Sequence, residues 1–151
     1  MFQPKLLLIV CACLILSLGS IAQTLTPLTS ARMGDNSYYD IAEVSPGRMW
    51  AAGEQGLLAE IDVNGVVTPI TVPDARINIL KILPTEEAIF LGGDNGTILR
   101  YDRTKENFIA SSFGKEFEKK CFYDLMLLDD GTLLAAGGHQ KISKAEKTLP
   151  K

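Results

Sequence analysis

A motif that recurs about every forty residues constrains the fold of this chain more than any other feature. Each copy holds an apolar run, a polar turn, a second apolar run rich in Ala and Gly, and a glycine turn. Gly53, Gly93 and Gly137 occupy one column of the alignment, 40 and 44 residues apart. The three copies align without internal gaps over residues 39–58, 79–99 and 123–138. Repetition at this period is typical of folds that stack one structural unit several times.

The turns within the copies predict β-hairpins. Asp94-Asn95-Gly96 carries the strongest signal, because Asn and Gly accept the positive φ angles of a two-residue hairpin turn. Glu54-Gln55-Gly56 is its weaker counterpart in the first copy, whereas the third copy has His139-Gln140-Lys141 there. Pro46-Gly47 and Asp130-Gly131 form the preceding turn of their copies.

Further strands complete each unit. A third strand is expected at 57–61 and 97–101, and a fourth at 66–72 and 107–111. Four short antiparallel strands in about forty residues are the pattern of a propeller blade. The sequence therefore predicts an all-β fold, a partial β-propeller of about three four-stranded antiparallel blades; an unrelated β-sandwich is the alternative. The expected blades are 38–73, 78–112 and 122–144, with a linker at 23–37 and a frayed tail at 145–151.

Two stretches, WAAGEQGLL at 50–58 and FLGGDNGTILR at 90–100, resemble the blade motif of a known family. It is the group of propellers similar to the photosystem II stability and assembly factor, which is related to the sialidase-like propellers with Asp-box repeats. The second copy matches the motif well, the first has Glu60 after its strand, and the third departs after Gly138. The usual Asp-box continuation is absent. The resemblance implies an architecture rather than an activity. The Ala and Gly residues of the copies fit it, because strands that crowd near a propeller axis need small side chains.

Three blades do not close a propeller ring, which takes four to eight. The chain ends in a lysine-bearing segment, residues 141–151, where the third blade would finish. We therefore interpret the sequence either as a truncated reading frame or as open sheets that another copy completes. Open blade edges expose unpaired backbone groups, so self-association is expected.

The first 22 residues have the features of a secretory signal peptide. Lys5 supplies the positive start, an apolar run covers 6–18, and small residues precede a cleavage site between Ala22 and Gln23. The run is shorter than the about 20 apolar residues of a spanning helix, and an uncleaved anchor is the alternative. We expect a signal-peptide helix here, and a mature chain that is secreted, periplasmic or at the cell surface, without a stable membrane span.

Charge and cysteine content narrow the partners and cofactors. The net charge of −3 becomes −4 when the predicted signal peptide, which contains a single Lys, is removed. A nucleic-acid binder would instead carry a basic surface. Cys121 is then the one cysteine left, so no intrachain disulfide can form, and it is expected to be a small buried hydrophobic residue. We expect no cofactor, because no phosphate-cradling glycine loop and no metal-spaced cysteine set occurs.

No catalytic, cofactor-binding or metal-ligating set of residues can be assigned. His139 is the single histidine and lies in a polar turn, and Asp129-Asp130 are expected to be turn formers. Asp40 and Asp124 share a column and are expected to make a hydrogen bond that repeats with the blade. The mature chain has five arginines: Arg32, Arg48, Arg76, Arg100 and Arg103. None lies in a motif that would assign it to the arginine triad of a sialidase.

These features favour an exported binding or assembly module without an evident catalytic site. Its partner would be an unidentified protein or glycan that contacts the loops on one face of the blades. A fragment of a sialidase-like glycoside hydrolase and a non-functional remnant of a longer propeller are the alternatives.

Overall fold

A computed structural model describes residues 35–112, 117–138 and 141–145. The predicted signal peptide, with its cleavage site between Ala22 and Gln23, lies outside the described residues, as do His139 and the tail after Ala145. The described part is all-β, and the turn after β2 (Arg48–Gly53) is the short 3-10 turn η1 (Glu54–Gly56). The all-β fold expected from the repeat is confirmed.

The strands form three antiparallel sheets, and within each sheet the strands that pair are neighbours in sequence. The first sheet contains β1 (Tyr38–Ser45), β2 (Arg48–Gly53), β3 (Leu58–Ile61) and β4 (Val67–Pro69). The second contains β5 (Ile79–Pro84), β6 (Ala88–Gly93), β7 (Thr97–Asp102) and β8 (Asn107–Ser112). The third contains β9 (Phe122–Leu127), β10 (Leu133–Gly137) and β11 (Lys141–Ala145).

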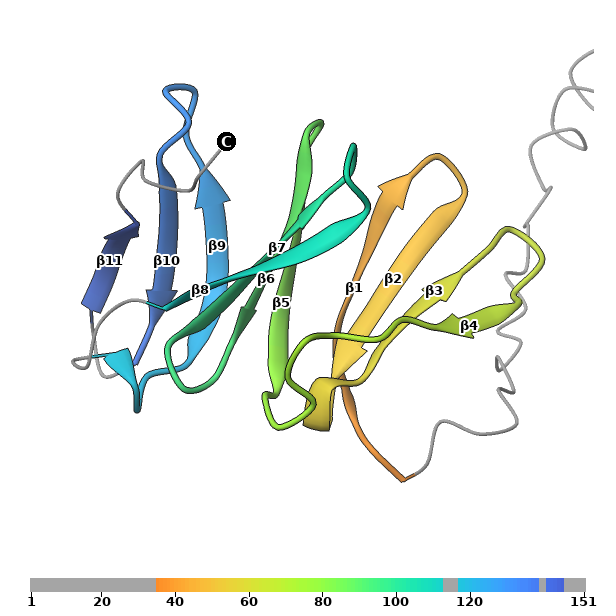
Figure 1. Cartoon of the computed structure of the whole chain (residues 1–151), viewed down its shortest axis with the longest axis horizontal. Coiled ribbons are helices and arrows are strands. Elements are labelled where there is room, and N and C mark those ends of the chain that lie inside the picture. Colours follow the sequence, from red (N-terminus) through yellow and green to blue (C-terminus); the bar gives the residue numbers. More distant parts are fainter. Residues whose placement is uncertain (1–34, 113–116, 139–140, 146–151) are drawn as a thin grey trace, which may run out of the picture.

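The sheets stand side by side in the order of the sequence (Figure 1). The first strands of the sheets contact one another, β1 with β5 and β5 with β9. The second sheet therefore lies between the other two and is covered on both faces. Its central strand β6 is an unbroken apolar run in which every residue is buried, whereas a strand covered on one face alternates apolar and polar residues.

Two hydrophobic clusters fill the spaces between the sheets. The first cluster joins the first and second sheets: Val44, Trp50, Ala52, Leu58, Val72, Ile77, Ile79, Ile82, Ile89, Leu91 and Leu99. The second joins the second and third sheets: Ala88, Phe90, Ile98, Phe122, Leu125, Leu133 and Ala135. Burying a large apolar side chain contributes about 1.5–3 kcal/mol, so these two clusters hold the sheets in their order.

The shared glycine column has a steric cause in every sheet. A Cβ atom at Gly53, Gly93 or Gly137 would lie 2.0, 2.8 or 1.7 Å from a backbone carbonyl oxygen. In each case that oxygen belongs to the residue before the first strand of the same sheet. The close approach at each of these glycines therefore lies within one sheet, and the expectation of crowding near a propeller axis stays a prediction.

The glycine turns after β2 and β6 connect neighbouring sheets. The N–H of Gly56 donates to the carbonyl of Ile77 (2.6 Å), and the N–H of Gly96 donates to the carbonyl of Lys120 (2.8 Å). Both acceptors lie just before the first strand of the following sheet. Both glycines have positive φ angles, 70° and 65°, and a Cβ at either would meet the backbone of the next connection.

Candidate ligand pocket between the first and second sheets

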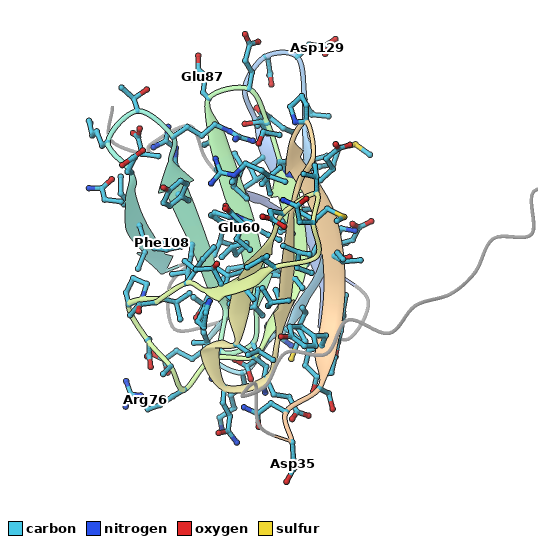
Figure 2. The ribbon with its side chains drawn as sticks, turned by 90° about the vertical axis from the view of Figure 1, so that its right-hand side faces the viewer. Asp35, Glu60, Arg76, Glu87, Phe108 and Asp129 are labelled. Carbon is cyan, nitrogen blue, oxygen red and sulfur yellow. The ribbon has the colours of Figure 1, made fainter. Side chains whose placement is uncertain are left out.

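A cavity of about 310 Å³ opens where the first and second sheets face each other. One of its lining residues, the labelled Glu60, lies between Glu87 at one end of the sheets and Asp35 at the other (Figure 2). Apolar side chains of Val44, Ile70 and Ile89 line part of the wall. The polar and aromatic lining residues are Ser45, Arg48, Trp50, Glu60, Thr68, Tyr101, Arg103 and Glu106.

An aromatic cluster supports one wall. The ring of Trp50 meets Tyr101 edge-on with centroids 5.1 Å apart, and Phe108 packs on Tyr101 at 5.0 Å. Tyr101 and Phe108 are directly paired across β7 and β8, which fixes their rings side by side. The indole is only 4% exposed, so it shapes the wall and offers little of its face to a ligand.

A charged pair lies next to the indole. Glu60 is paired opposite Trp50 across β2 and β3, so both side chains point toward the second sheet. Its Oε2 accepts a hydrogen bond from Trp50 Nε1 (3.2 Å) and another from Arg48 Nη2. The bond to Glu60 raises the pKa of the Arg48 guanidinium above its ordinary value. Glu60 is therefore held in place by two donors.

Arg103 connects the two sheets across the pocket. Its Nη2 donates to the carbonyl of Val44 at the end of β1 (2.6 Å), and its Nε donates to the carbonyl of Thr85 (2.9 Å). Two hydrogen bonds to fixed backbone atoms lock the plane of the guanidinium. The remaining N–H groups of the five that a guanidinium carries stay available to another acceptor.

The turn that carries Arg103 is organised by Asp102. Its Oδ1 accepts hydrogen bonds from the N–H groups of Thr104 and Lys105, both at 3.0 Å, and its Oδ2 meets Arg100 Nη1 at 3.0 Å. These bonds, the one from Arg100 first, hold the pKa of the Asp102 carboxyl below its ordinary value. The same turn ends at Glu106, whose φ of 51° is left-handed.

Two solved structures of the extracellular domain of one signalling protein from B. thetaiotaomicron are similar to this chain in fold. One, described as a one-component system, has a TM-score of 0.56 and 20% sequence identity over 70% of this chain. The other, described as a hybrid two-component system, has a TM-score of 0.61 and 18% identity over 78%. The likeness is one of fold alone. No family model and no curated protein matches the chain.

This chain spans 14% and 16% of the two extracellular domains that it matches. Its structural neighbours are thus extracellular, and they are much longer than the matched region. No helix in the described ranges is long and apolar enough to cross a membrane.

The turn residues singled out from the sequence lie away from the pocket. Gly53, Gly93 and Gly137 end β2, β6 and β10, where they allow the close approach described above. Gly56, Asn95, Gly96 and Gly131 occupy turns with positive φ angles of 70°, 54°, 65° and 78°. Their geometry is structural, and it positions the sheets that form the pocket.

The arginines do not gather at one point. Arg48 and Arg103 line the same pocket, but Arg100 is held by Asp102 and Arg76 pairs with Asp74 on an exposed connection. Arg32 lies outside the described residues. Asp130 accepts a hydrogen bond from the N–H of Thr132 (2.9 Å), as a turn former does. In the described ranges, no group of three or more metal-ligating side chains is present.

The aspartates of the repeat occupy equivalent positions, each just after a register shift at the start of its strand. Asp40 and Asp124 each accept a hydrogen bond from the N–H of the next residue, both at 3.0 Å. Lys81 holds that position in the second sheet and lies between them, with Nζ 3.5 Å from Asp40 and 3.8 Å from Asp124. The expected repeated hydrogen bond is present in both copies. Half-exposed ion pairs of this kind contribute little to stability.

Sequence reasoning missed the pocket. Strand alternation could have placed Trp50 and Glu60 on one face, because they are paired across β2 and β3. It could not indicate which sheet would cover that face. Arg103 and Glu106 lie in the turn between β7 and β8, where the sequence has no periodic pattern to follow.

Proposed function

We propose that this chain is an exported binding module of propeller type that holds a small ligand in the pocket between its first and second sheets. The arrangement around Arg103 carries the proposal. A guanidinium held by two backbone carbonyls lines a cavity that also has a fixed carboxylate and apolar walls. Polar groups that are fixed before binding lose little entropy when a ligand arrives.

The propeller assignment rests on the regularity of the sheets. All three sheets repeat the same register shift in the first strand and the same close glycine contact. Equivalent units that pack face to face in sequence order are expected to rotate about a common axis. The predicted signal peptide and the extracellular location of the structural neighbours support export.

The size of the pocket selects the kind of ligand. A cavity of about 310 Å³ is at the lower end for small-molecule sites, which run from about 300 to 1,000 Å³. A protein partner would instead bind on the loops, which leaves the pocket unexplained. We therefore favour a small molecule as the first partner to test.

The single tryptophan of the chain makes binding directly measurable. Because Trp50 lines the pocket, a ligand should shift its emission and raise the melting temperature of the protein. A panel of amino acids, dipeptides, monosaccharides and disaccharides would be tested in both assays. Arg103→Met should abolish the response, and Tyr101→Phe, which keeps the ring packing, should weaken it.

Arg76→Met is the matched control, because Arg76 is exposed and lies outside the pocket, where it pairs with Asp74. It should leave the response intact. A panel without any response, or a response that survives in Arg103→Met, would contradict the proposal.

A further inference from the structure

The charges around the pocket are balanced, and this balance restricts the ligand. Arg48 and Arg103 supply two positive charges, and Glu60 and Glu106 supply two negative charges. A simple anion would meet both carboxylates, and a simple cation would meet both guanidinium groups. A molecule that carries both charges can be attracted at both of its ends.

We propose, resting on the function argued above, that the pocket binds a small zwitterion, namely a free α-amino acid with an apolar side chain. Its carboxylate would bind to Arg103, its ammonium group to Glu106, and its side chain to the apolar wall. The α-carboxylate and α-ammonium groups of an amino acid are joined through one carbon, so a compact site can reach both.

The carboxylate end is assigned by the geometry of Arg103. Nε and Nη2 are already used on Thr85 and Val44, which orients the guanidinium but leaves further N–H groups for a ligand. Arginine is well suited to carboxylates, because its planar donors match the two oxygens. Arg48 is less suited, because Glu60 already holds its guanidinium.

The ammonium end is assigned by comparing the two carboxylates. Glu60 already accepts from Trp50 and Arg48. Glu106 is exposed at the mouth, and its side chain has no hydrogen bond to any of the described residues. Glu106 is therefore the carboxylate that can take a new donor without giving up an existing one.

The third contact concerns the side chain of the ligand. Val44, Ile70 and Ile89 form an apolar wall beside the charged groups. Trp50 is almost fully covered, so a sugar ring would find little indole face to stack on. An aliphatic side chain fits this wall better than a polyhydroxylated ring, whose hydroxyl groups would lose water there without new hydrogen bonds.

Chemical variants of one ligand test both charges. The full chain would be titrated with leucine, valine, isoleucine and methionine, with N-acetyl-leucine and leucinamide, and with maltose, following Trp50 emission and heat. At least one free amino acid should bind. N-acetyl-leucine, which lacks the positive charge, and leucinamide, which lacks the negative charge, should bind at least tenfold more weakly than leucine.

A substitution at Glu106 tests whether this residue binds the ammonium group of the ligand. Glu106→Gln should weaken leucine binding about tenfold and remove the difference between leucine and N-acetyl-leucine. Glu86→Gln, on the exposed turn between β5 and β6, is the matched control and should leave both unchanged.

The outcomes separate this inference from the function on which it rests. If maltose binds with a Trp50 shift that Arg103→Met removes, and no amino acid does, the zwitterion inference is overturned and the binding function stands. Binding of leucinamide or N-acetyl-leucine as tight as that of leucine also overturns the inference. If neither these ligands nor the wider panel bind, both the zwitterion inference and the proposed binding function are overturned.

Discussion

Glycine is required at the shared column for reasons of space, not of backbone conformation. At Gly53 a Cβ would lie 2.0 Å from the carbonyl oxygen of Ser37, a distance that no side chain tolerates. The atom that it would meet is backbone, so relief needs a shift of the strand itself. Gly131 is the opposite case, because its φ is 78° but a Cβ would have nothing within 4 Å.

These two glycines give a matched pair of alanine substitutions. Gly53→Ala should destabilise the protein by about 3 kcal/mol, the upper end for overpacking. Gly131→Ala should lose only about 1 kcal/mol, the strain of one left-handed residue. Urea unfolding followed by Trp50 fluorescence would measure both. Equal losses would show that steric crowding is not what selects glycine at position 53.

At the scale of elements, the connection between β7 and β8 depends on one carboxylate. Asp102 binds the side chain of Arg100 and two backbone N–H groups of the turn. Because these partners lower the pKa of Asp102 in the folded state, they stabilise the fold at pH values above the ordinary aspartate pKa of about 3.9. This stabilisation is lost as the pH falls below that value and through the lowered folded pKa.

The sign of the effect sets the pH profile of Asp102→Asn. The variant should be less stable than the parent at pH 7 and pH 5, and the gap should close as the pH falls below about 4. Urea midpoints at several pH values would show this. Asp129→Asn, at the tip of the turn between β9 and β10 (Figure 2), is the control and should follow the parent throughout. A gap that widens in acid would contradict the assignment.

The elements were more predictable from the sequence than the pocket was. The recurring turn and the glycine column indicated three antiparallel sheets, because hairpin signals are local and Asn95-Gly96 needs only its own backbone angles. The contact of Arg103 with Val44 joins residues 59 positions apart. Such a contact follows from how whole sheets pack, which no local pattern in this chain encodes.

For the whole molecule, the third sheet differs from the other two in what covers it. Trp50 and Phe90 occupy the same column, and both are buried under the sheet that follows. Leu134 has that position in the third sheet and is half-exposed, since no further sheet in the described residues covers it. Met126 of β9 is directly paired with Leu134 and is 59% exposed, so the two side chains form an apolar strip on this uncovered face.

This apolar strip is where the self-association expected from the sequence should occur, through a second copy of the chain. Exposed apolar side chains that are contiguous favour association, whereas isolated ones do not. Sedimentation analysis should therefore show an average mass that rises with protein concentration. Met126→Lys should shift the chain toward monomer, because Met126 is 59% exposed within the strip and a lysine there would have to lose its water.

Val63→Lys provides the comparison, because Val63 is 77% exposed and lies on the turn between β3 and β4, in the first sheet rather than the third. The same change of charge at that site should leave the mass unchanged, which separates a local effect on the strip from a general effect of added charge. A chain that stays monomeric at all concentrations would show that the third sheet needs no cover. An equal response to both lysines would place the contact elsewhere.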